Sequence, residues 1–189
     1  MNIKQLNEMP RSESGDWDFN EFGPEPLSMK TTDVEKRFRL RFVRNVGDKY
    51  YLFFWDNYNR WYLAEELDNG NCLIIGYLKV KDYPKINNSY QIDGIEIHPN
   101  YRSKGLSTFM YREINVKTGK TLVSDFVQYD NSRKIWLALS NSHGVKMFDT
   151  KTGEKTDVVK IKDLDDPDIW GDDHANKLLI YETQVLELG

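Results

Sequence analysis

Apolar and polar residues alternate through the middle of the chain, with the period of strands that bury one face. The alternation begins at residue 36, with arginines on one side and apolar residues on the other: Arg37, Arg39 and Arg41 against Phe38, Leu40 and Phe42. Further strands are predicted at residues 50–55, 60–65, 72–80 and 90–98. Short turn sequences separate them, which predicts an antiparallel meander.

The spacing of apolar residues then changes to a helical period. It predicts helices over residues 106–116 and 131–139, with a strand at 121–126 between them. Their apolar positions are Leu106, Phe109, Met110 and Ile114, then Ile135, Trp136 and Leu139. The rest of the prediction consists of strands at 145–148 and 158–161, an acidic loop at 163–173, and a strand or helix at 178–188.

Residues 1–33 lack a sustained period and contain Pro10, Pro24 and Pro26 among scattered acids. We therefore predict an N-terminal arm or irregular segment there, and a single domain over residues 34–189, a length for which one core suffices. Because the chain contains 9 Phe, 5 Trp and 11 Tyr, this core should be rich in aromatic residues and strands.

The formal net charge of -4 conceals an uneven distribution. Residues 34–126 carry 15 basic and 11 acidic side chains, whereas both flanking segments are acidic. A locally positive segment can gather a phosphorylated ligand without making the protein a general nucleic-acid binder. The row formed by Arg37, Arg39, Arg41 and Arg44 could contact nucleic acid, but charged protection of a sheet edge is the favoured interpretation.

Cys72 is the sole cysteine, which excludes an intramolecular disulfide and a cysteine-based zinc site. The histidines have no spacing typical of a metal site, so no metal is predicted. The longest wholly apolar run, residues 50–55, is too short to span a membrane, and the N-terminus lacks a signal-peptide core. We expect a soluble, cytoplasmic protein with no membrane contact.

The most informative stretch runs from Ile95 to Thr108 and reads IEIHPNYRSKGLST. A predicted strand passes through a turn at Pro99 into a basic loop with a glycine, and the loop opens a helix. Backbone N–H groups at such a helix start have no partner within the helix and lie at the positive end of its dipole. Together with Arg102 and Lys104 they predict an anion site suited to a pyrophosphate.

At these residues the sequence resembles the GNAT superfamily of acyl-CoA N-acyltransferases, whose loop reads Gln or Arg, two residues, Gly, one residue, then Gly or Ala. Here the loop is Arg102-Ser103-Lys104-Gly105-Leu106-Ser107, in which Ser107 departs from the pattern. The resemblance covers roughly residues 60–149. It implies an α/β (α+β) fold with a mixed, mostly antiparallel central sheet flanked by helices, and a strand, loop and helix at residues 90–117.

The resemblance also implies a co-substrate, acetyl-CoA or another acyl-CoA. In the family the loop holds the pyrophosphate of coenzyme A, and the preceding strand pairs with the pantetheine arm. The implied binding residues are Ile95, Ile97, Arg102, Ser103, Lys104, Gly105, Leu106, Ser107 and Thr108. The expected function is transfer of the acyl group from this thioester to an amine that the sequence does not identify.

Acyl transfer to an amine needs a base for the amine and an acid for the departing thiolate. The candidate bases are Glu96, His98 and Asp125. Each has a structural alternative: Glu96 as a solvent-facing strand residue, His98 as a turn residue, and Asp125 as a cap or turn residue. In the family the acid is often a tyrosine on the second helix, where this chain has Trp136, whose indole cannot protonate a thiolate.

A second hypothesis is a catalytically inactive binding or inhibitor module of the same fold, which engages a protein or a nucleic acid. Trp136 and Ser107 favour it, and the intact basic loop opposes it. A protein partner is expected at the acidic loop or the N-terminal arm. An amine on a modified nucleobase, as acceptor, ranks lower. The acidic loop itself does not fit a calcium-binding loop, because Pro167 and Asp168 occupy positions that the pattern reserves for a ligand and a glycine.

Overall fold

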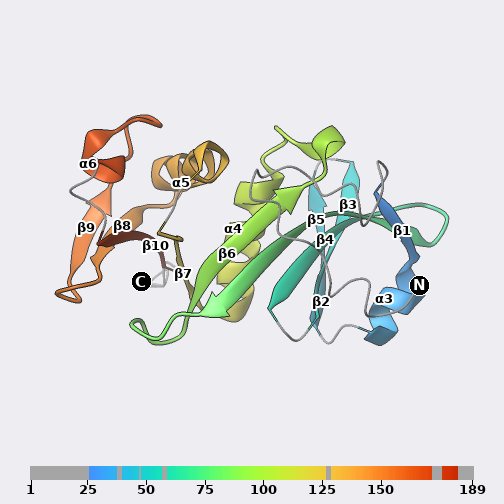
Figure 1. The fold of residues 1–189 in the computed structure, drawn as a ribbon. Coiled ribbons are helices and arrows are strands. Elements are labelled where there is room, and N and C mark those ends of the chain that lie inside the picture. The colour runs from blue at the N-terminus through green and yellow to red at the C-terminus, as the bar shows by residue number, and fades with distance from the viewer. Residues whose placement is uncertain are drawn as a thin grey trace, which may run out of the picture. The chain divides into compact units, whose positions relative to one another are not determined.

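The structure, a computed structural model, describes residues 26–37, 40–46, 48–56, 59–126, 129–171 and 176–182 (Figure 1). Within them the chain divides into two compact units. The first unit contains the described residues up to Lys79 together with Gly94–Leu106. The second contains Val80–Asp93 and the described residues from Ser107 onward.

An antiparallel meander forms the sheet of the first unit. Its strands are β2 (Leu40–Val46), β3 (Lys49–Trp55), β4 (Arg60–Glu66) and β5 (Asn71–Asp82), the last of which continues into the second unit. Each strand pairs with the next, and the register between β4 and β5 shifts at Leu63/Ala64. The predicted meander is therefore confirmed.

Residues 27–37 form a strand and a helix, where the sequence predicted an irregular arm to residue 33 and a strand from residue 36. Strand β1 (Leu27–Lys30) pairs with β5, and α3 (Thr31–Arg37) follows it. Asp33 in the first turn favours this helix through the helix dipole. Since α3 occupies the start of the alternating pattern, the strand begins only at Leu40. The side chains of the predicted arginine row lie outside the described residues.

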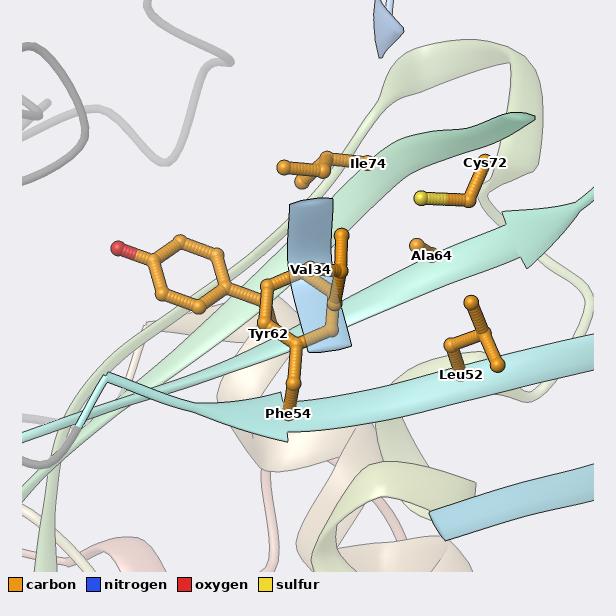
Figure 2. Close-up of a cluster of buried hydrophobic side chains, with 7 residues drawn as sticks. All are labelled: Val34, Leu52, Phe54, Tyr62, Ala64, Cys72 and Ile74. Atoms are coloured by element: carbon orange, nitrogen blue, oxygen red, sulfur yellow. The ribbon is translucent and has the colours of Figure 1, made fainter. Parts of the chain in front are cut away.

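Aromatic and aliphatic side chains fill the core of the first unit, as predicted. One buried cluster joins α3 to the facing side of the meander and contains Val34, Leu52, Phe54, Tyr62, Ala64, Cys72 and Ile74 (Figure 2). The rings of Phe54 and Tyr62 stack with centroids 5.2 Å apart. Phe53, Trp61 and Leu63 are also buried. These aromatic residues therefore form part of the core.

The second unit combines helices with a smaller mixed sheet. Its elements are α4 (Leu106–Thr118), which starts at the last residue of the first unit, β7 (Thr121–Val123), α5 (Asp130–Ser142), β8 (Val145–Asp149), β9 (Lys155–Val159), α6 (Pro167–Trp170) and β10 (Lys177–Tyr181). The beginning of β6 (Ser89–Ile97) pairs with β7 in parallel. The other pairs, β7 with β10, β10 with β8, and β8 with β9, are antiparallel.

The predicted fold class is confirmed, and the bounds of several predicted strands differ. The strand predicted at 121–126 ends at Val123, and beyond it the Ser124 N–H donates to the Leu179 carbonyl oxygen while the Ser124 Oγ accepts from the Leu179 N–H. The strand predicted at 158–161 covers Lys155–Val159. Of the segment predicted at 178–188, residues to Tyr181 form β10, and residues 183–189 lie outside the described residues.

The acidic loop is held by its own side chains and by Arg133 of α5. Asp166, which is 2% exposed, caps α6 by accepting from the Asp168 N–H, and it also accepts from the Lys162 N–H. Arg133 on α5 donates to the Leu164 carbonyl oxygen and lies 5.3 Å from the ring centre of Trp170. Among the described residues, no group of His, Cys, Asp and Glu could hold a metal ion. No described helix is long and apolar enough to cross a membrane.

Candidate functional site

The predicted strand, loop and helix are present at residues 89–118. At the end of β6, the His98 N–H donates to the Ile75 carbonyl oxygen of β5 over 2.8 Å. A short 3₁₀ helix, η1 (Pro99–Tyr101), follows. The His98 Nδ1 caps it by accepting from the Asn100 N–H at 3.4 Å. His98 is 1% exposed, so its structural role as a turn residue accounts for its position.

Residues 102–105, which we call the diphosphate loop, turn the chain from η1 into α4. Ser103 and Gly105 have positive φ angles of 61° and 72°. Alternation of left-handed and right-handed residues aims successive N–H groups to one side and forms an anion-binding concavity. Within the described part of the chain, no backbone hydrogen bond outside helices and strands has its donor at residues 103–105. These N–H groups are therefore open to a ligand.

The space above Gly105 is also open. A Cβ built there would meet no heavy atom within 4 Å. The positive φ at this position favours glycine in any case. A diphosphate could thus approach the backbone closely. The next residues, Leu106, Ser107 and Thr108, form the first turn of α4, with Leu106 buried and the other two half-buried.

The two cations of the loop have different surroundings. The Arg102 Nε donates to the Ile97 carbonyl oxygen at 2.9 Å, so part of the guanidinium fixes the loop to the end of β6. Lys104 is exposed, and its Nζ lies 5.0 Å from the ring centre of Tyr101. Of these two cations, Lys104 is therefore the one whose whole charged group is available to a ligand.

The two isoleucines predicted to line the pantetheine arm differ in burial. Ile97 is 5% exposed and packs against β5, where a Cβ at Gly76 would come within 2.5 Å of its Cδ1. Its carbonyl oxygen already accepts from Arg102. Ile95 is half-buried. Of the two, Ile95 is the better placed to contact a ligand.

Glu96 is buried between these isoleucines, with 7% of its surface exposed. The solvent-facing alternative is therefore wrong. The Tyr77 hydroxyl on β5 donates to its carboxylate, and burial, followed by the charge of Glu96, raises the pKa of Tyr77. The Arg60 guanidinium lies 5.8 Å from the Tyr77 ring centre and is itself 8% exposed. A carboxylate, a phenol and a guanidinium thus share one buried site in the first unit.

A protein-family model matches the part of the chain that contains the diphosphate loop. The model of the Acetyltransferase (GNAT) family matches residues 30–117, which include β6, the diphosphate loop and α4 up to Lys117. Residues 30–117 belong to the GNAT superfamily. The match begins before the predicted residue 60, and residues 118–149 of the predicted resemblance lie outside it. GNAT proteins generally use an acyl-CoA, mainly acetyl-CoA, as co-substrate.

A solved structure that resembles the chain is the crystal structure of nourseothricin acetyltransferase, which is 14% identical, with a TM-score of 0.33, and covers 82% of this chain and 93% of that chain. No curated protein matches the sequence.

The remaining GNAT candidates lie in the second unit. The Asp125 Oδ1 accepts from the N–H of the next residue, Phe126, at 2.8 Å, a local contact that fits the turn alternative. Tyr129 is the N-cap residue of α5, so Asp125 does not cap that helix. Trp136 is 1% exposed and packs edge-on against Tyr111 of α4, with ring centroids 5.7 Å apart. Trp136 is thus a core residue of the second unit.

The sequence did not predict Tyr77, Arg60 or Tyr111 as neighbours of the GNAT candidates. Tyr77 and Arg60 come from β5 and β4, and only the sheet register places them near Glu96. Tyr111 is buried, and burial, followed by the charge of Asp125, raises its pKa. The helical spacing of apolar residues in α4 was the one available signal for its burial.

Proposed function

We propose that this chain is an acyl-CoA-dependent N-acyltransferase that uses acetyl-CoA to acylate an amine. The observation that carries the proposal is the diphosphate loop, with left-handed Ser103 and Gly105, free N–H groups and the start of α4 directly after it. Membership of residues 30–117 in the GNAT superfamily supports it independently.

Coenzyme A would be held by the loop and by β6. The N–H groups of residues 103–108 would donate to the diphosphate, Lys104 would add a positive charge, and Ile95 would contact the pantetheine arm. When bound, the thioester supplies an activated acyl group and a thiolate leaving group. Arg102 contributes charge while its Nε holds the loop to Ile97.

Glu96 is the base that we favour among Glu96, His98 and Asp125. His98 already caps η1, and Asp125 already accepts from its neighbour. Glu96 would accept a proton from the acceptor ammonium, which frees the nitrogen lone pair for attack on the thioester carbonyl. Tyr77 would hold the carboxylate in position. The acceptor amine itself stays open.

One observation favours a second candidate, a GNAT module that binds a partner without catalysis. The position where the family often has a tyrosine holds Trp136, whose ring is in the core with Tyr111. Among the described side chains, we therefore assign none as the acid for the thiolate. A catalytic chain would release coenzyme A as a thiolate that solvent protonates.

Calorimetric titration with acetyl-CoA tests the first proposal. We expect the wild-type protein to bind and a Gly105→Glu variant to lose most of its affinity, since the new carboxylate occupies the open space above the loop. A Gly153→Glu variant, at another glycine with positive φ and open space, is the matched control. No binding by the wild-type protein at millimolar acetyl-CoA would exclude the enzyme.

Release of the thiol over a panel of amines separates the two candidates. Binding together with amine-dependent thiol release supports the transferase. Binding of acetyl-CoA without thiol release for any amine in the panel favours the non-catalytic module. Pull-down experiments would then test whether a partner protein binds the acidic loop.

A further inference from the structure

A cluster of polar side chains in the first unit adjoins the diphosphate loop and takes no part in the chemistry above. It consists of Lys49 on β3, Glu65 on β4 and Tyr101 at the end of η1, and we call it the Tyr101 clamp. The Lys49 Nζ donates to the Glu65 Oε1 in an ion pair. Glu65 is 7% exposed, so this carboxylate is largely removed from solvent.

Tyr101 connects this buried pair to the loop. Burial, followed by a hydrogen bond to Glu65, raises the pKa of the Tyr101 hydroxyl to about 12. The Tyr101 ring lies 5.9 Å from the Lys49 Nζ and 5.0 Å from the Lys104 Nζ, measured to its centroid. The His98 and Tyr101 rings pack edge to face, with their centroids 6.0 Å apart. Tyr101 therefore contacts the strands through its hydroxyl and the loop cation through its face.

The diphosphate loop needs such an anchor. Ser103 is a non-glycine residue in the left-handed region, a conformation that persists only where the surroundings impose it. The Arg102 N–H donates to the Pro99 carbonyl oxygen, whereas among the described residues the N–H groups of residues 103–105 donate no backbone hydrogen bond outside helices and strands. The conformation of the loop thus depends on its flanks, where Arg102 is bonded to Ile97 and Tyr101 to Glu65.

We propose that Tyr101, held by Glu65 and Lys49, is a positioning residue that sets the conformation of the diphosphate loop and places Lys104 beside the diphosphate of coenzyme A. The proposal rests on the proposed function. It assigns the three residues to affinity for coenzyme A and not to the chemical step.

The test compares Tyr101→Phe, Glu65→Gln and the double variant, using coenzyme A for calorimetry and acetyl-CoA for kinetics. Loss of one hydrogen bond to a charged group predicts that each single variant binds coenzyme A at least about tenfold more weakly than the wild type. Because both changes remove the same contact, the double variant should bind coenzyme A no more weakly than the single variant with the lower affinity. The KM for acetyl-CoA should rise while kcat at saturation is unchanged.

Tyr51→Phe is the matched control. Tyr51 on β3 is buried and lies near the same Glu65 carboxylate, but it is not on the loop. We expect its affinity for coenzyme A to stay within twofold of the wild type. Thermal unfolding verifies that each variant is folded, and Glu65→Gln with Lys104→Met carries the test if Tyr101→Phe does not fold.

Unchanged affinity in Tyr101→Phe, or losses that multiply in the double variant, would overturn this proposal and leave the proposed function intact. A fall in kcat without a rise in KM would also overturn it. If the wild-type protein does not bind coenzyme A, both proposals fail together.

Discussion

Glu96 illustrates how a strand residue acquires a chemical role from its neighbours. Its own position in the alternating pattern is that of an ordinary polar residue. Burial beside Tyr77 and Arg60 changes this, because a carboxylate with little exposure needs nearby donors. The sequence identified Glu96 as a candidate but not its partners, since these depend on the pairing of strands far apart in the chain.

The first prediction concerns this carboxylate. Glu96→Gln keeps the shape and removes the base, so kcat for the acylated amine should fall by about 100-fold or more. The KM for acetyl-CoA should stay unchanged, because Glu96 does not belong to the diphosphate loop. Steady-state kinetics near neutral pH measure both constants.

Glu66→Gln, at the half-buried end of β4, is the control and should retain its activity. A Glu96→Gln variant with the full wild-type kcat would show that another group is the base. Tyr77→Phe should give an intermediate loss, since it keeps the carboxylate and removes only its hydrogen bond.

At the scale of elements, the stretch from β6 to α4 was predictable because its signals are local. Pro99, the glycine in the loop and the apolar spacing of α4 all lie within the segment that they describe. Strand β1 has no such signal, since its partner is β5 and Leu27 lies opposite Ile74. The helix α3 has only 7 residues, too few for a clear periodic pattern.

The second prediction concerns the close approach of β5 and β6 in the first unit. A Cβ at Gly76 would lie 2.7 Å from the Glu96 carbonyl oxygen and 2.5 Å from the Ile97 Cδ1. Gly76→Ala should therefore lower the free energy of unfolding by about 1–3 kcal/mol, since a backbone carbonyl cannot move aside freely. Urea denaturation measures this change.

Adding Ile97→Val to the Gly76→Ala variant separates the contact with the Ile97 Cδ1 from the contact with the Glu96 carbonyl oxygen, because valine lacks the Cδ1 atom. We expect the double variant to recover only part of the loss, with Ile97→Val alone as the reference. Full recovery of the free energy of unfolding would mean that the contact with the Glu96 carbonyl oxygen does not contribute to the loss.

The third prediction concerns the end of β10 and its pH dependence. Burial raises the pKa of Glu182, but hydrogen bonds from Lys155 and Lys146 lower it more, so its net pKa is below the ordinary value. The folded state then binds this proton less tightly than the unfolded chain. The stabilisation is present above pH 4.5 and is lost as the pH falls through the lowered pKa.

Glu182→Gln should accordingly lower Tm at pH 7 by about 1–2 °C, the size expected for a partly exposed ion pair. The difference from the wild type should shrink when the pH is lowered below 4.5. A Tm difference that stays constant over this range would contradict the assignment. Calorimetric scans at several pH values provide the measurement.

At the scale of the whole chain, three lysines of the basic middle third form ion pairs with carboxylates of the same segment. Lys49 pairs with Glu65, Lys81 with Asp93, and Lys120 with Asp82. Lys104 makes no ion pair with another described residue and is exposed on the loop. The composition alone located the positive segment but could not separate paired from unpaired lysines, because pairing depends on the folded sheet.

The fourth prediction follows from this distribution of charge. Raising NaCl from about 0.1 M to about 1 M shortens the Debye length from about 10 Å to about 3 Å, so coenzyme A should bind roughly tenfold more weakly. Lys104→Met should show a shallower salt dependence than the wild type. Affinity that does not change with salt in either protein would exclude electrostatic capture of the diphosphate.

Cys72 has a practical consequence for all of these experiments. It is the chain's sole thiol, and it is fully buried in the core of the first unit (Figure 2). A colorimetric thiol reagent should therefore detect coenzyme A released by the proposed reaction, with no background from the native protein. The same reagent, without acetyl-CoA, should titrate one sulfur per chain only when this core opens, so a single dye reports both catalysis and unfolding.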